Sequence, residues 1–224
     1  MRAMILAAGR GQRLRPLTDH TPKPLLEVGG KALLEYTLER LSAAGYHAIV
    51  INLGHLGEQI PPRLGDGSRW GVHIHYSQEP PGALETAGGI RHALPWLCPD
   101  NTDDPFLVVN GDLWCDHPLH PPTLAMPTLA HLVLVPNPEH HPDGDFALTP
   151  SGHLSLQDHP RWTFSGIGWY RTHLFRHLDP GPRPLAPVLR AAIAQQHITG
   201  TVYHGRWLDV GTPERLAALI EHGR

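Results

Sequence analysis

Two glycines and several cationic residues follow one another closely near the N-terminus. Gly9 and Gly11 come after a short apolar run, and Arg10, Arg13 and Lys23 lie in the segment that follows. Glycine lets a backbone approach a ligand and turn its N–H groups toward it. Backbone donors beside arginine and lysine make an anion site, for which a polyphosphate is the natural ligand. The segment therefore predicts a site for a nucleoside triphosphate.

The spacing within this segment excludes two common phosphate-binding motifs. A Walker A loop requires Gly-Lys-Ser or Gly-Lys-Thr, which does not follow here, and Leu14 occupies the third glycine position of the dinucleotide fingerprint. Taken singly, the glycines also fit a tight turn beside solvated arginines. That simpler interpretation explains poorly why Arg13, Pro16, Thr18 and Lys23 stand so close together.

Two aspartates stand at the ends of apolar runs far apart in the chain. Asp112 follows Gly111, and Asp209 precedes Gly211 by two residues. A triphosphate reaction usually needs Mg²⁺, which proteins hold with one or two carboxylates plus phosphate oxygens and water. Each aspartate alone also fits the cap of a turn, where aspartate is common. Together they predict a shared Mg²⁺ site.

The hydrophobic pattern indicates which elements position these residues. Short apolar runs predict strands at 3–8, 48–53, 72–76, 106–109, 130–135, 146–148, 163–170, 201–203 and 207–210. Helical spacing predicts helices from 32 to a stop at Gly45, over 56–64, over 88–94 ending before Pro95, over 185–194, and from a Thr212 cap to His222.

Strands alternate with helices through the first half, and the second half has more strand per helix. This order is typical of an α/β fold with a mostly parallel mixed sheet flanked by helices. We expect one Rossmann-like domain over residues 1–224, with a small antiparallel elaboration between about Leu113 and Tyr170. Open α/β sheets bind ligands at the carboxyl ends of their strands. Residues 9–23, 110–112 and 209–211 are therefore expected to meet in one crevice.

Composition narrows the class of protein. The 224 residues are 41% hydrophobic and 17% charged, with a formal net charge of -3, as in an ordinary globular protein. That balance and the lack of a long basic run disfavour a nucleic-acid partner. No apolar stretch approaches the roughly 18 residues of a membrane span. Cys98 and Cys115 form no CxxC pair. We expect a cytoplasmic protein without a membrane partner.

The 18 histidines raise the question of a zinc site. His117 and His120 flank one short tract, and His140 and His141 are adjacent in another. Zinc needs three or four converging ligands, and adjacent loop histidines diverge. We expect these histidines to be solvated or hydrogen-bonded.

Four motifs, in order, resemble the sugar-1-phosphate nucleotidyltransferases, and the resemblance covers essentially the whole chain. They are LAAGRGQRLRPLT at 6–18 with PKPL at 22–25, VNGD at 109–112, FSGI at 164–167 and LDVGT at 208–212. Gln12 stands where the family usually has threonine. The resemblance implies the family's Rossmann-like nucleotidyltransferase fold and Mg²⁺ as its cofactor.

The same resemblance implies roles for single residues. Nucleotide binding is implied for Ala7, Ala8, Gly9, Gly11, Arg13, Lys23, Gly82, Ala83 and Asn110, sugar binding for Glu85, Asn137 and Gly166, and Mg²⁺ binding for Asp112 and Asp209. Arg13 and Lys23 are the implied catalytic residues. The implied reaction is in-line attack of a sugar-phosphate oxygen on the α-phosphorus, with pyrophosphate leaving. It needs no protein nucleophile, only positioning and charge stabilisation.

The choice of substrates rests on two further segments. Residues 84–89 and 137–146 resemble the short members that use UTP and N-acetylmuramate 1-phosphate in bacterial cell-wall recycling. Members that guanylylate mannose 1-phosphate are the nearest alternative. A noncatalytic nucleotide-sugar sensor on the same fold is a hypothesis of another class. It predicts loss of a metal aspartate or the loop lysine, and Asp112, Asp209 and Lys23 are all present.

Overall fold

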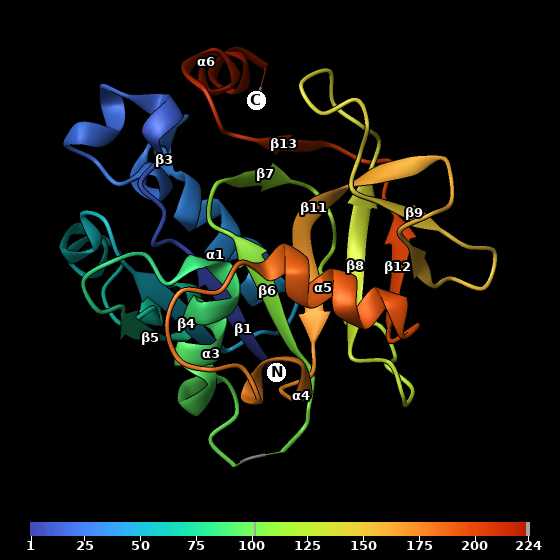
Figure 1. The fold of residues 1–224 in the computed structure, drawn as a ribbon. Coiled ribbons are helices and arrows are strands. Elements are labelled where there is room, and N and C mark those ends of the chain that lie inside the picture. The colour runs from blue at the N-terminus through green and yellow to red at the C-terminus, as the bar shows by residue number, and fades with distance from the viewer. Residues whose placement is uncertain (101, 223–224) are drawn as a thin grey trace. The chain divides into compact units, whose positions relative to one another are not determined.

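A computed structural model describes residues 1–100 and 102–222, without the side chain of His222 (Figure 1). Its contacts group the chain into two compact units. Unit 1 comprises residues 1–83, 109–119 and the described residues from 206 onward, and unit 2 comprises residues 84–108 and 120–205. A single domain over residues 1–224 stays a prediction.

Unit 1 contains parallel strands whose carboxyl ends meet at one edge. β1 (Arg2–Leu6) pairs in parallel with β4 (Ala48–Leu53), which pairs in parallel with β5 (His73–Gln78). The end of β6 (Phe106–Asn110) lies on the other side of β1. Apolar, buried residues fill β1, β4 and β6, as expected of strands covered on both faces, whereas β5 alternates buried and more exposed residues. The strands predicted at these four places are confirmed.

Helices and short turns complete unit 1. They are η1 (Gln12–Leu14), η2 (Leu17–Asp19), η3 (Lys23–Leu25), α1 (Leu33–Ala43), η4 (Gly57–Gln59), α2 (Ile60–Leu64), η5 (Ser68–Trp70) and α6 (Pro213–His222). Two small antiparallel ribbons accompany them, β2 (Glu27–Val28) with β3 (Lys31–Ala32) and β7 (Leu113–Cys115) with β13 (Trp207–Asp209). α6 begins at Thr212-Pro213 as predicted, and the Arg215 N–H donates to the Thr212 hydroxyl over 3.4 Å.

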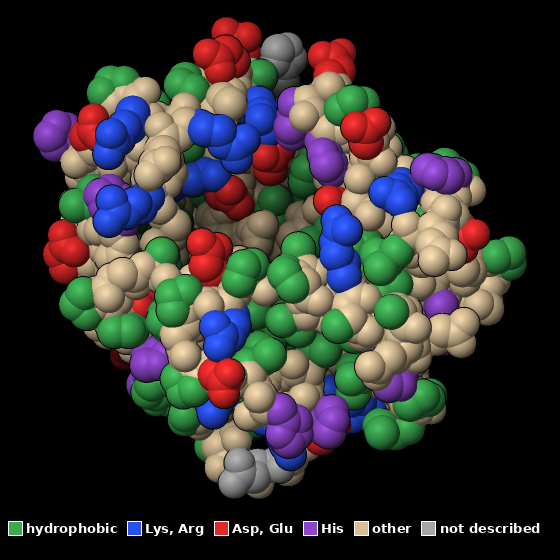
Figure 2. Space-filling model, in the orientation of Figure 1, with side chains coloured by type: hydrophobic (Ala, Val, Ile, Leu, Met, Phe, Trp, Pro, Cys, Tyr) green, Lys and Arg blue, Asp and Glu red, His purple; other side chains and the backbone are tan. Residues whose placement is uncertain are grey.

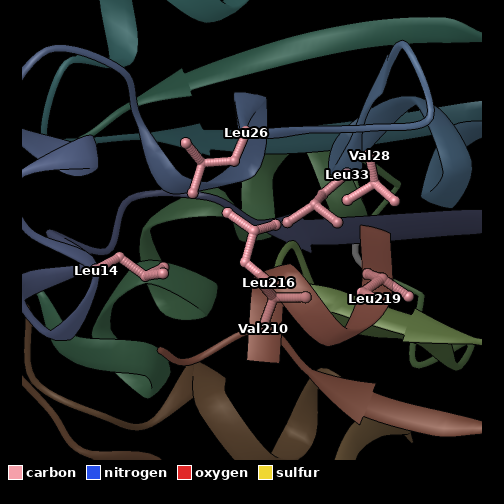
Figure 3. Packing of buried hydrophobic residues seen from close by; sticks show 7 residues of the cluster. All are labelled: Leu14, Leu26, Val28, Leu33, Val210, Leu216 and Leu219. Atoms are coloured by element: carbon pink, nitrogen blue, oxygen red, sulfur yellow. The ribbon is translucent and has the colours of Figure 1, made fainter. Parts of the chain in front are cut away.

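A buried apolar cluster joins the last helix to the N-terminal segment. Figure 3 shows its members, which are Leu14, Leu26, Val28, Leu33, Val210, Leu216 and Leu219. Leu14 follows the glycine loop, Val210 follows β13, and Leu216 lies on α6. Burying such side chains stabilises by about 1.5–3 kcal/mol each. The cluster therefore fixes the glycine loop and the start of α6 against each other.

Unit 2 contains a mixed sheet with three helices. Its elements are α3 (Glu85–Leu97), the first part of β6, β8 (Ala130–Val135), β9 (Phe146–Leu148), β10 (Leu154–Ser155), β11 (Arg161–Tyr170), α4 (His173–Arg176), α5 (Leu185–Ala194) and β12 (Ile198–Val202). β11 is antiparallel to β8 and β9, whereas β12 is parallel to β8. Together with unit 1, these strands confirm a mixed sheet flanked by helices.

Two predicted boundaries were wrong. The helix expected to end before Pro95 continues through it to Leu97, because one proline removes a single intrahelical bond and the last turn still closes from Leu94 to Cys98. The strand expected at 201–203 runs from Ile198 to Val202, where Gly200 interrupts the apolar pattern. The two-residue strands and the short α4 were not predicted, since so few residues show no periodicity.

Candidate active site

The glycine loop after β1 folds back on itself. Gly11 has φ +60°, and a Cβ there would lie 2.8 Å from Cγ2 of Thr18 and 3.2 Å from Cβ of Lys23. The Thr18 hydroxyl donates to the Gly11 carbonyl over 2.9 Å. Only glycine fits this backbone and this space. The loop thereby brings Lys23 close to Gly11, while Gly9 and Arg13 remain exposed.

A buried polar chain links the carboxyl ends of β1, β4 and β5. The Ala7 N–H donates to Oδ1 of Asn52 over 2.7 Å, and Nδ2 of Asn52 donates to Oε1 of Glu79 over 2.7 Å. Both side chains are almost fully buried. Asn52 therefore orients the start of the glycine loop. Sequence analysis missed Asn52 and Glu79, although their polar character at strand ends was a usable signal.

Lys23 forms an ion pair with Asp112. The Lys23 ammonium donates to Oδ2 of Asp112, with side-chain exposures of 13% and 25%. Gly111 makes this approach possible, because its N–H donates to the Leu6 carbonyl over 2.9 Å and a Cβ there would lie 2.7 Å from that oxygen. The predicted loop cation and the first predicted metal ligand are thus brought together. Since this pair is mostly shielded from water, its attraction is stronger than that of a surface pair.

Asp209 forms the second ion pair, with Arg215 of α6. Nη1 of Arg215 contacts both carboxylate oxygens of Asp209. A Cβ on Gly211 would lie 3.0 Å from Oδ2 of Asp209, 3.1 Å from Nη1 of Arg215 and 3.3 Å from Nη2 of Arg13. Three charged side chains therefore surround Gly211. Sequence analysis missed Arg215, although the predicted helix start at Thr212 would have placed it in the first turn.

The two aspartates lie on adjacent chain segments of unit 1. Asp209 ends β13 and pairs with Leu113 of β7, which directly follows Asp112, and the Val210 N–H donates to the Asp112 carbonyl over 3.0 Å. Carboxylate oxygens are ligands that Mg²⁺ accepts. Within the described residues, no group of three or more His, Cys, Asp or Glu side chains converges as a metal site. A cation held by these two carboxylates would take its other ligands from phosphate and water.

Cys115 stands in β7, three residues after Asp112. Burial raises the pKa of Cys115, the thiol nearest in sequence to Asp112, so it stays protonated at neutral pH. The Thr212 hydroxyl accepts the Arg215 N–H and so caps the start of α6. The contacts described around Asp112 and Asp209 are ion pairs and hydrogen bonds.

The remaining predicted nucleotide residues also lie in unit 1. Ala8 follows β1 and accepts the His55 N–H at 3.4 Å, and Asn110 ends β6, half-buried. Gly82 and Ala83 are exposed, and Gly82 has φ +100°. Figure 2 shows Lys and Arg side chains, with some Asp and Glu, over the area where Figure 1 draws the N-terminal turns and α6. All the predicted nucleotide and metal residues thus belong to one compact unit.

The predicted sugar residues all lie in unit 2. Asn137 donates to the carbonyls of Pro142 and Arg161 over 2.9 and 3.0 Å and accepts from the Thr163 hydroxyl over 2.9 Å. Gly166 is buried with φ +82°, where the register of β11 against β8 shifts. Glu85 is exposed at the start of α3 with φ +60°. Contacts from these three residues to a sugar stay predictions.

No described helix is long and apolar enough to cross a membrane.

Comparison with known proteins identifies the family. Residues 2–129 match the family model described as nucleotidyl transferase. The N-acetylmuramate alpha-1-phosphate uridylyltransferase of Neisseria meningitidis is 51% identical over 96% of this chain and 95% of its own length. The protein of the same name from Caulobacter vibrioides is 32% identical over 96% of this chain and 94% of its own length.

Solved structures agree on the fold. A putative glucose-1-phosphate thymidylyltransferase from Bacillus anthracis superposes with a TM-score of 0.80 over 99% of this chain and 96% of that one, at 22% identity. HddC from Yersinia pseudotuberculosis, complexed with GMP-PN, gives 0.77 over 100% and 99%, at 18% identity. The chain belongs to the nucleotidyl transferase family and is a sugar-1-phosphate nucleotidyltransferase.

Proposed function

We propose that this enzyme converts UTP and N-acetylmuramate 1-phosphate to UDP-N-acetylmuramate and pyrophosphate. The observation that supports this most is the 51% identity, over nearly the whole chain, to a relative named for that activity. A mannose-1-phosphate guanyltransferase of Gibberella zeae is 28% identical over the same share of this chain. We place the activity in the cytoplasm, in the recycling of peptidoglycan.

Unit 1 would hold the triphosphate. The exposed backbone around Gly9 and Gly11 presents N–H donors, and Arg13 and Lys23 neutralise phosphate charge. Lys23 forms an ion pair with Asp112, so an arriving phosphate would compete with that carboxylate for the Lys23 ammonium. The hydrogen bond from Ala7 to Asn52 already fixes the start of the glycine loop. Little conformational entropy is therefore lost there when the nucleotide binds. The exposed Gly82 and Ala83 are proposed to contact the base.

The reaction itself would depend on charge and alignment. The phosphate oxygen of the sugar 1-phosphate attacks the α-phosphorus of UTP in line, a new P–O bond forms, and the bond to the β-phosphate oxygen breaks, releasing pyrophosphate. Asp112 and Asp209 would hold Mg²⁺, which supplies charge neutralisation to the phosphates when bound. Arg13 and Lys23 offset the repulsion between the two anionic substrates and stabilise the charge on the leaving pyrophosphate.

Unit 2 would choose the sugar. Gly166 offers backbone without a side chain at a bulge, where a ring can approach closely. Asn137 orders the loop that follows β8, and Glu85 is exposed to accept a hydroxyl. These assignments rest on the family motifs, and their geometry supports Gly166 and Glu85 better than a direct contact from Asn137.

A substrate panel tests the proposal. Pyrophosphate release is measured with UTP, GTP, CTP and dTTP, each combined with the 1-phosphates of N-acetylmuramate, N-acetylglucosamine, glucose and mannose. We expect the highest kcat/KM with UTP and N-acetylmuramate 1-phosphate. A preference for GTP with mannose 1-phosphate would replace the proposed substrates, and no release with any pair would overturn the enzymatic assignment.

A further inference from the structure

We propose that Arg215 is a positioning residue that holds the Asp209 carboxylate and weakens the binding of a free divalent cation there when no nucleotide is bound. Metal binding would then depend on the arrival of the triphosphate. This inference rests on the proposed Mg²⁺ role of Asp209 and adds a residue that the family motifs did not assign.

Arg215 contacts Asp209 through several atoms. Its Nη1 reaches both carboxylate oxygens of Asp209, and it also lies 3.3 Å from the Asp209 backbone carbonyl. The two side chains are only 17% and 21% exposed. A pair shielded in this way is weakened less by salt than a surface pair. Arg215 therefore occupies the oxygens that a cation at Asp209 would use.

The position of Arg215 is fixed by the fold. It lies in the first turn of α6, where the Thr212 hydroxyl accepts its N–H over 3.4 Å. The next residue, Leu216, is buried in the cluster with Leu14 and Val210 (Figure 3). The backbone on both sides of the ion pair is thus anchored. Arg215 cannot leave Asp209 by a movement of α6 without exposing that cluster, so it is displaced only by side-chain rotation.

The electrostatic consequence follows from Coulomb's law. A guanidinium in contact with a carboxylate both occupies its lone pairs and repels an approaching divalent ion. Nη2 of Arg13 lies 3.3 Å from the same Cβ position of Gly211 and adds to this repulsion. A triphosphate carries the opposite charge and draws both arginines toward its oxygens. Free metal should therefore bind weakly, and metal that arrives with nucleotide should bind well.

The test measures Mn²⁺ binding to the full chain without nucleotide, using the electron paramagnetic resonance signal of free Mn²⁺. Arg215→Gln should lower the Mn²⁺ dissociation constant about tenfold, which corresponds to about 1.4 kcal/mol of binding free energy. Arg215→Lys keeps the charge but replaces the planar guanidinium with a single ammonium donor. We therefore expect it to lower the Mn²⁺ dissociation constant only about threefold. Arg206→Gln is the matched control, because it removes the same charge from an exposed position of unit 1.

The outcomes separate the inference from the proposed function. If Asp209→Asn binds Mn²⁺ as the wild type does, the metal role of Asp209 is wrong. If Asp209→Asn loses binding but both Arg215 variants match the wild type, the metal role stands and the inference is overturned. Should Arg215→Gln not fold, the Arg215→Lys constant decides alone, and a value equal to that of the wild type contradicts the inference.

Discussion

The two units use their polar residues in different ways. In unit 1, the predicted site residues Lys23 and Asp112 pair with each other, and Asp209 pairs with Arg215 of the last helix. In unit 2, Asn137 makes hydrogen bonds to Pro142 of its own loop and to Arg161 and Thr163 of β11. The charged side chains of unit 1 can therefore exchange their ion partners for a phosphate or a metal ion. The predicted sugar residues of unit 2 instead help to fix the local backbone, through buried positions and internal hydrogen bonds.

This difference matches what each half of a two-substrate reaction needs. Phosphate and Mg²⁺ are recognised by charge, which a few lysine, arginine and aspartate side chains supply. A sugar offers mainly hydroxyl and amide groups, which are recognised by shape and by hydrogen bonds, and N-acetylmuramate adds one carboxylate. Substitutions in unit 1 should therefore act on turnover, and substitutions in unit 2 should act on sugar affinity and stability.

The largest effect is expected at Asp112. Asp112→Asn removes the charge that would hold the metal and leaves Lys23 without its ion partner, so kcat should fall about a hundred- to a thousandfold. Steady-state pyrophosphate release measures kcat, and circular dichroism checks that the fold survives. Glu58→Gln, an exposed charge change in unit 1, is the control. Near-normal turnover of a folded Asp112→Asn protein would show that Asp112 is not part of the active site.

A smaller effect, of a different kind, is expected at Asn137. Asn137→Ala leaves the Pro142 and Arg161 carbonyls and the Thr163 hydroxyl without this partner, so the free energy of unfolding should fall by about 2 kcal/mol. The KM for the sugar phosphate should rise, while the KM for UTP stays the same. Urea titration and two-substrate kinetics measure both. Unchanged stability with a large loss of sugar affinity would show a direct contact and would break the contrast between the units.

The smallest effect on activity is expected at Glu35 of α1. Burial alone would raise the pKa of Glu35, but the hydrogen bond from Ala32 and the charges of Arg63 and Arg69 outweigh it and lower the pKa overall. A lowered pKa stabilises the folded state above the unfolded value of about 4.3, and that stability is lost as the pH falls through the folded pKa.

Glu35→Gln should therefore cost about 1 to 2 kcal/mol at pH 7, since both arginines are partly exposed. The difference from the wild type should shrink below about pH 4. Unfolding in urea across this pH range measures it, and turnover at pH 7 should not change. A constant difference down to pH 3 would show that packing rather than charge is responsible.

Much of the fold could be predicted because long apolar runs dominate it. The runs at 48–53, 130–135 and 146–148 are strands with those same bounds. The ribbon of β2 and β3 could not be predicted in this way, since two-residue strands show no alternation. Their pairing depends on a Gly29-Gly30 turn with positive φ at both residues, which a search for runs does not detect.

The site was predictable where side-chain chemistry lies in a motif and was missed where it depends on distant partners. Lys23 and Asp112 were predicted as ligand-binding residues, and their ion pair brings together residues 89 positions apart. Asn52 and Glu79 were missed because their polar character at strand ends shows that each needs a partner but not that they bind each other and the start of the glycine loop. Arg215 was missed because its contact with Asp209 depends on the phase of α6.

The reaction of α-labelled UTP with N-acetylmuramate 1-phosphate tests the central claim most directly. The protein is first stripped of metal with a chelator, and Mg²⁺ is then restored. We predict that the label appears in UDP-N-acetylmuramate, that unlabelled pyrophosphate is released in equal amount, and that both require the restored Mg²⁺. Label in pyrophosphate, full turnover without the metal, or no UDP-sugar at all would contradict the account.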